Sequence, residues 1–234
     1  MTSATLLAAV LVMSAALSAV MAVAWRVQQR TGNSGWVDTI WTFGLGAIGI
    51  AAARQLAYRD PTTFGRLMDI VTNASIDYLD GQVRAGADLL QIFDSWAGNL
   101  PDGEFETWVV APTARIVAEL KRRHPETPII GFPRGAGANA PSYVRATKVA
   151  ALGCDTAMPL AQMRGLADGT GAAVQGNLDP LLLAAGGPKL DKRIRETLDA
   201  MRGAPFIFNL GHGIVPHTPP EHVARLVEIV RGGI

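Results

Sequence analysis

The sequence contains very little cysteine and few charged side chains for its length. A single cysteine, Cys154, occurs among 234 residues, which excludes an intramolecular disulfide and a cysteine-rich metal cage within one chain. Charged residues make up 18% of the chain, and 21 basic residues nearly balance 20 acidic ones. Because there is no basic surplus, we expect no nucleic-acid partner. A secreted disulfide scaffold is also excluded.

The scarcity of charge is concentrated at the N-terminus. Residues 1–58 contain four charged side chains: Arg26, Arg30, Asp38 and Arg54. The apolar run 4–25 would measure about 33 Å as a helix, enough to cross a hydrocarbon core of about 30 Å. A shorter apolar run that contains three glycines follows at 39–53. We therefore predict a membrane helical hairpin over residues 1–58, with one or two transmembrane helices.

A cleaved signal peptide is the alternative for this segment, since Ala22-Val23-Ala24 resembles a cleavage site. It is disfavoured because no Lys or Arg precedes the apolar run and a second apolar run follows. Three arginines flank the far end of the hairpin, Arg54, Arg59 and Arg66. Two lie in its turn, Arg26 and Arg30. This bias slightly favours both ends in the cytoplasm. The prediction is a membrane location with a cytoplasmic C-terminal domain.

The segment WRVQQRTGNSGWVDTIWTFGLG, residues 25–46, resembles the start of a family of multi-pass bacterial membrane proteins related to steroid 5-alpha-reductases. This resemblance implies a membrane segment over residues 1–58. The later helices that carry that family's cofactor-binding residues have no counterpart in this chain. The resemblance therefore implies no reductase activity for this chain.

Residues 59–234 show a different pattern, in which short apolar runs alternate with amphipathic stretches. The runs of strand length are 88–93, 128–132, 154–158, 172–175 and 205–209. The stretches with helical spacing are 67–86, 105–123, 142–152, 161–166, 180–201 and 219–230. Such alternation requires parallel strands covered by helices. Gly135-Ala136-Gly137 does not complete a dinucleotide-binding fingerprint, so we predict an α/β fold, an incomplete TIM-type (β/α)8 barrel with five of eight units.

In such a barrel the functional residues stand at the C-terminal ends of the strands. His212, between two glycines after the last strand, is the best functional candidate, although a structural imidazole is the alternative. Ser95 after the first strand is as easily a helix cap. Asp94 and Arg134 also follow strands, and Asp94 could be a cap or turn residue. We expect Cys154 to be an ordinary buried thiol and His124, His217 and His222 to be solvated.

Four segments then make a family recognisable. They are LLQIFDSWAGNL (89–100), IIGFPRGAG (129–137), VQGNLDP (174–180) and FNLGHGIVPHTPPEHV (208–223), and together they strongly resemble uroporphyrinogen decarboxylase. The resemblance covers about residues 62–232 and implies a (β/α)8 barrel enzyme that is a homodimer and uses no cofactor or metal. It implies that the enzyme converts the acetate side chains of uroporphyrinogen to methyl groups, giving coproporphyrinogen. It implies that Ser95 and His212 contact substrate carboxylates, with His212 catalytic. Asp94 and Arg134 lie where the family has pocket residues.

The same resemblance implies that some family residues lie outside the recognised segments. These are an arginine-rich loop, a tyrosine, and an aspartate that holds the pyrrole N–H groups, all in the first three βα units. We find none of them in residues 1–61. The sequence therefore leaves two hypotheses, a decarboxylase with an incomplete site, or an inactive membrane-tethered fusion fragment, joined near residues 58–62, that at most binds porphyrin-like polycarboxylates.

Cobalamin-dependent methyltransferases share this barrel but bind zinc through a His-x-Cys pair and a later cysteine. Gly213 follows His212 directly, and no cysteine follows Cys154. That alternative is disfavoured.

Overall fold

The computed structural model describes residues 52–232, together with nine single positions before residue 31: 15, 18, 19, 22, 23, 25, 26, 29 and 30. The chain divides into two compact units, residues 1–69 and 70–234. Most of the hairpin predicted over residues 1–58 lies outside the described residues. Within the described part of the chain, no helix is both long and apolar enough to cross a membrane.

Helix α3 (Pro61–Arg84) begins at a well-defined cap. The Oδ1 atom of Asp60 accepts a hydrogen bond from the backbone N–H of Thr63 at 3.0 Å, and its Oδ2 atom accepts one from the Thr63 hydroxyl at 2.7 Å. These bonds satisfy a donor that the first helical turn leaves free, and they lower the pKa of Asp60. Pro61 favours the start of the helix because its φ angle is already helical.

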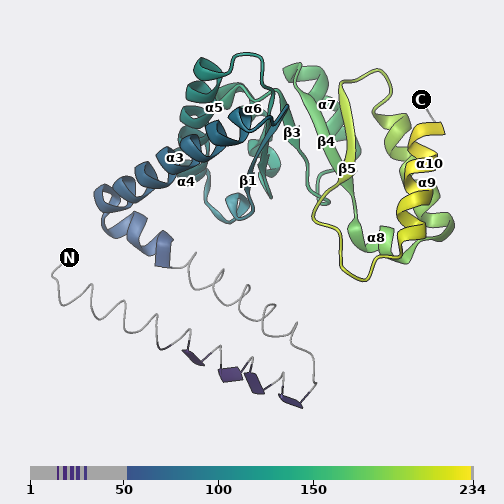
Figure 1. Cartoon of the computed structure of the whole chain (residues 1–234), viewed down its shortest axis with the longest axis horizontal. Helices are drawn as coiled ribbons and strands as arrows, with labels where there is room; N and C mark the ends of the chain where they lie inside the picture. The colour runs from purple at the N-terminus through teal and green to yellow at the C-terminus, as the bar shows by residue number, and fades with distance from the viewer. Residues whose placement is uncertain are drawn as a thin grey trace. The chain divides into compact units, whose positions relative to one another are not determined.

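Five parallel strands form one sheet in chain order (Figure 1). They are β1 (Leu90–Asp94), β2 (Ile129–Pro133), β3 (Ala151–Gly153), β4 (Ala173–Leu178) and β5 (Phe206–Leu210). Between β1 and β2 lie the turn Ala97–Asn99, α4 (Asp102–Phe105), the π-helical turn Glu106–Val110 and α5 (Ala111–Arg123). The turn Gly137–Asn139 and α6 (Ala140–Thr147) lead to β3, α7 (Leu160–Thr170) leads to β4, and α8 (Pro180–Ala185) and α9 (Gly187–Ala200) lead to β5. Helix α10 (Pro220–Gly232) follows β5. The predicted α/β class with a parallel sheet is confirmed, and the arrangement is consistent with part of a TIM-type barrel.

The helices pack against one another in the order of the strands, α5 on α6, α6 on α7, α7 on α9 and α9 on α10. Alternate strand residues face this helical layer and are almost fully buried: Leu90, Ile129, Leu152 and Val174. The strand residues that alternate with these buried ones face the other side of the sheet. On that side, 65% of the Phe93 surface and 39% of the Ile207 surface are exposed. The helices thus cover one face of the sheet, and the opposite face carries the pocket described below.

Three elements differ clearly from the sequence prediction. Helix α6 ends at Thr147, not near residue 152, because Lys148 adopts a left-handed conformation with φ 59° and caps the helix. Strand β3 consequently occupies 151–153 in place of the predicted 154–158. The predicted helix over 180–201 is two helices, since Gly186 has φ 68° and a Cβ there would overlap the His222 ring.

Candidate functional site

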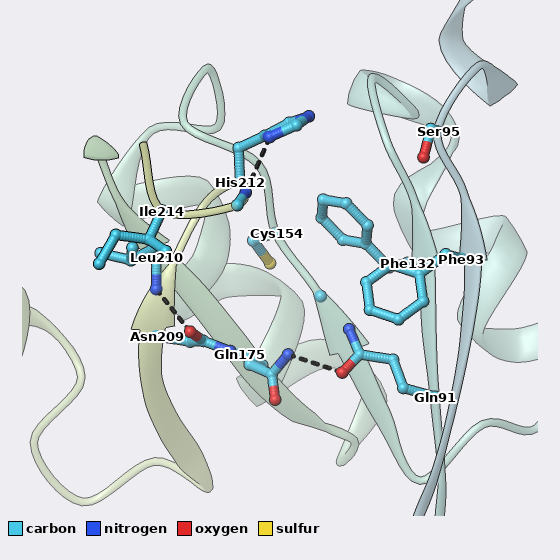
Figure 2. Close-up of a pocket in the computed structure, with 12 residues that line it drawn as sticks. Gln91, Phe93, Ser95, Phe132, Cys154, Gln175, Asn209, Leu210, His212 and Ile214 are labelled. Atoms are coloured by element: carbon cyan, nitrogen blue, oxygen red, sulfur yellow. Dashed lines mark hydrogen bonds between the residues drawn. The ribbon is translucent and has the colours of Figure 1, made fainter. Parts of the chain in front are cut away.

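A pocket of about 360 Å³ lies on the face of the sheet opposite the helices, at the C-terminal ends of the strands (Figure 2). It is lined by Gln91, Phe93, Ser95, Phe132, Gly153, Cys154, Gln175, Asn209, Leu210, His212, Gly213 and Ile214. Strands β1, β2, β4 and β5 contribute side chains to it, and β3 contributes Gly153. The volume lies toward the lower end of the range for small-molecule sites.

His212 lies in the exposed segment that follows β5 and lines this pocket. The backbone N–H of Gly213 donates to Nδ1 of His212 at 2.8 Å. Since Nδ1 accepts this bond, the proton of a neutral ring is on Nε2, which is then free to donate. Gly211 sets the position of the segment, because a Cβ at this residue would lie 2.5 Å from the backbone nitrogen of Thr156.

Ser95 follows β1 and lines the same pocket, with an exposed side chain. Figure 2 shows Ser95 and His212 on opposite sides of the cavity. They come from the two outer strands of the sheet, 117 residues apart in the sequence. The structure thus brings together in one pocket two site residues that the sequence analysis predicted from their positions after strands.

Asp94 and Arg134, the other two predicted site residues, do not line the pocket. The Asp94 carboxylate accepts a hydrogen bond from the backbone N–H of Trp96 at 3.2 Å, and burial raises the pKa of Asp94. The backbone N–H of Arg134 donates to the Asp94 carbonyl at 3.0 Å, and the Arg134 carbonyl accepts from Gly98 at 2.9 Å. Both residues therefore tie together the loops after β1 and β2, and their contact with substrate stays a prediction.

Three carboxamide side chains, which the sequence analysis did not select, lie at the floor of the pocket: Gln91, Gln175 and Asn209. The Nε2 group of Gln175 donates to Oε1 of Gln91 at 3.4 Å, across 84 positions of sequence. The backbone N–H of Leu210 donates to Oδ1 of Asn209 at 2.8 Å. Strand alternation could have identified these residues, since Gln91 stands two positions before Phe93 and four before Ser95.

Aromatic rings and a buried thiol complete the pocket. The rings of Phe93 and Phe132 meet edge to face at a centroid distance of 5.9 Å. Gly153 leaves room for this pair, since a Cβ there would lie 2.5 Å from Phe132. Cys154 is 1% exposed, and burial raises the pKa of its thiol to about 12. A thiol in this state is not a nucleophile, in agreement with the expectation of an ordinary buried cysteine.

Among the described residues, the side chains that line this pocket carry no carboxylate, lysine or arginine. In the part of the chain that the structure describes, no cluster of three or more potential metal ligands occurs. An apolar wall with several neutral hydrogen-bonding groups, at the C-terminal ends of parallel strands, is typical of the class of βα-barrel proteins that bind small molecules.

Within this class the chain belongs to the uroporphyrinogen decarboxylase (URO-D) family, whose family model matches residues 10–233. A uroporphyrinogen decarboxylase of Novosphingobium aromaticivorans is 49% identical over 202 residues, which cover 86% of this chain and 59% of that protein. One from Gluconacetobacter diazotrophicus is 50% identical over 188 residues, which cover 80% of this chain and 53% of the relative. The chain thus spans between half and two thirds of the length of these relatives.

A solved structure with a similar fold is a methyltransferase from Methanosarcina mazei, with a TM-score of 0.68 and 22% sequence identity. The match covers 78% of this chain and 53% of the methyltransferase. At this identity the likeness shows the fold alone.

The family match corrects the prediction of a membrane location. It extends over residues 10–58, which we assigned to the membrane hairpin. The predicted membrane location of the chain is therefore wrong. The predicted relation of residues 25–46 to steroid 5-alpha-reductase-like proteins gains no support, since the URO-D match includes that segment.

Proposed function

We propose that this chain carries a uroporphyrinogen decarboxylase site that converts acetate side chains of uroporphyrinogen to methyl groups and so forms coproporphyrinogen. The observation that carries the proposal is the common pocket of Ser95 and His212. The URO-D membership, together with relatives that are named uroporphyrinogen decarboxylases, supports the same reaction.

The chemistry requires that a carboxylate be held while the pyrrole ring is protonated. The bond between the methylene and the carboxyl carbon then breaks, its electron pair neutralises the protonated ring, and CO₂ leaves. The methylene takes up a proton to become a methyl group, and the ring loses its added proton. In this scheme the Ser95 hydroxyl and the Nε2–H of His212 donate to substrate carboxylates and fix the side chain in the reactive orientation.

Incubation of the purified chain with uroporphyrinogen tests this proposal. We expect coproporphyrinogen to form in the wild type and to fall sharply in His212→Ala. Turnover that does not depend on His212, or no turnover, contradicts the proposed site.

A binding protein without catalysis is the second candidate, favoured by one observation. The resemblance implies a carboxylate that accepts the pyrrole N–H groups and stabilises positive charge on the ring, and no side chain lining the described pocket is a carboxylate. A lost charge contact of this kind costs several kcal/mol, or about a thousandfold in rate. Uroporphyrin binding without turnover would favour this candidate.

The family resemblance also makes a homodimer part of the proposal. Light scattering on the purified chain measures its mass directly. A value near twice 24.7 kDa is expected for the dimer.

A further inference from the structure

The orientation of two amide groups at the floor of the pocket is set by their neighbours. The Oε1 atom of Gln91 accepts a hydrogen bond from Gln175, and Oδ1 of Asn209 accepts one from the backbone of Leu210. In each amide the oxygen is therefore occupied, and the NH₂ group has no hydrogen-bond partner among the described residues. Figure 2 shows the amide oxygen of Gln91 on the dashed line from Gln175 and its nitrogen on the side of the phenylalanine rings. The floor thus presents N–H donors that can bind an acceptor of a ligand in the pocket.

Among the described residues, no charged side chain lines this pocket, which distinguishes it from a second cavity. That cavity, of about 400 Å³, is lined by the basic Lys189, Lys192 and Arg193 and by the acidic Asp179 and Glu196, among other residues. A carboxylate in the Gln91 pocket would instead be held by neutral donors. This difference matters for decarboxylation, because a cation paired with the carboxylate stabilises the ground state and loses its partner as CO₂ forms. Neutral donors orient the group with a smaller penalty of this kind.

We propose that Gln91 and Asn209 bind the carboxylate of the acetate side chain that is decarboxylated, through their amide N–H groups. Gln175 acts as a positioning residue, since its N–H group fixes the orientation of the Gln91 amide. This inference rests on the proposed function and assigns substrate-binding residues beyond Ser95 and His212.

Two isosteric substitutions test the proposal. Gln91→Glu keeps the oxygen that accepts from Gln175, and Asn209→Asp keeps the oxygen that accepts from Leu210. Each replaces the NH₂ group of a pocket-lining amide with a carboxylate oxygen. Asn73→Asp is the matched control, because it adds the same charge on α3 and keeps the oxygen that accepts from Arg115 at 2.8 Å.

The probes are uroporphyrin, which carries acetate and propionate groups, and coproporphyrin, in which methyl groups replace the acetates. Fluorescence titration of the full chain should show wild-type preference for uroporphyrin. Gln91→Glu and Asn209→Asp should each weaken uroporphyrin binding about ten- to a hundredfold, the range of a hydrogen bond to a charged group. Binding of coproporphyrin to both variants, and of both probes to Asn73→Asp, should stay unchanged.

A third substitution tests the positioning role. Gln175→Glu places an acceptor against Oε1 of Gln91, so the Gln91 amide must turn and direct its oxygen into the pocket. We expect a loss of uroporphyrin preference over coproporphyrin, which a general structural role would not produce. Circular dichroism of each variant shows whether it folds, and Asn209→Asp keeps the test valid if a glutamine variant does not.

The two proposals can fail separately. If the wild type prefers uroporphyrin and the three pocket variants keep that preference, the amide assignment is overturned and the proposed function stands. If the wild type does not distinguish the two porphyrins, the amide assignment is overturned, and the turnover assay with His212→Ala decides the proposed function by itself.

Discussion

The Oδ1 atom of Asp80 lies 2.7 Å from Nε2 of His124, so a contact between two side chains joins helix α3 to the end of α5. Asp80 is buried and also pairs with Arg84 at 2.9 Å and with Arg123 at 3.6 Å. The hydrogen bond with His124 is the main cause that lowers the pKa of Asp80. The expectation that His124 is solvated was therefore wrong.

This contact predicts an acid-sensitive contribution to stability. Because the pKa of Asp80 is lower in the folded chain than its usual value of about 3.9, its stabilising effect is complete above about pH 4. The effect is lost as the pH falls through the folded pKa. Asp80→Asn should therefore lower the melting temperature at neutral pH, and the deficit relative to wild type should shrink below about pH 4. Thermal denaturation followed by circular dichroism from about pH 7 to about pH 2 measures it.

Asp199→Asn is the matched control. Asp199 pairs with Arg202 at 2.7 Å, but both side chains are mostly exposed, and such pairs contribute little. Its melting temperature should follow the wild type at every pH. If the melting temperature of Asp80→Asn stays below that of the wild type by the same amount down to about pH 2, the charge of Asp80 is not the cause of the difference.

The Ser95 hydroxyl is expected to contribute to substrate affinity without contributing to stability. Its side chain is exposed at the pocket, and a hydrogen bond to a charged group is worth about 1.5–3 kcal/mol. Ser95→Ala should lower kcat/KM for uroporphyrinogen about ten- to a hundredfold and leave the melting temperature unchanged. Ser75→Ala is the control, since that hydroxyl donates only to the Val71 carbonyl of its own helix. Equal kinetics for the two variants would remove Ser95 from the site.

Two glycines flank His212, and the structure predicts different outcomes for them. A Cβ at Gly211 would lie 2.5 Å from the Thr156 backbone nitrogen, whereas a Cβ at Gly213 meets no heavy atom within 4 Å. Gly211→Ala should cost about 1–3 kcal/mol of stability, displace His212 and reduce turnover. Gly213→Ala should melt like the wild type. Thermal denaturation and the decarboxylase assay compare them, and equal melting of both variants would contradict the close contact at Gly211.

The order of strands and helices was predictable from apolar periodicity, and four of the five predicted strands overlap the observed ones. The strand predicted at 154–158 was misplaced because Gly153 looked like the helix stop, while the residue that ends α6 is Lys148 in a left-handed conformation. Nothing in the local sequence marks a lysine for that conformation, which tertiary contacts impose.

Only part of the site could be predicted from the sequence, because some of its residues depend on how the whole sheet is arranged. Ser95 and His212 stand at strand ends, a position with a general meaning in parallel sheets. Gln91 and Asn209 lie within strands, where a polar side chain is informative only once it is known which face the helices leave uncovered. The bond between Gln175 and Gln91 joins the first and fourth strands and depends on the register of the whole sheet.

Cys154 offers a direct measurement of how well the pocket wall is packed. Burial raises the pKa of its thiol from 9.0 to about 12, which lowers the thiolate fraction about a thousandfold at mildly alkaline pH. Because it is the only cysteine in the chain, a thiol reagent such as dithionitrobenzoate reports on this site alone. The native protein should react at least a thousand times more slowly than the same protein in denaturant. Fast labelling of the native chain would mean that the wall formed by strand β3 opens readily, and Phe132→Ala, which removes the ring packed over Gly153, should move the protein toward that behaviour.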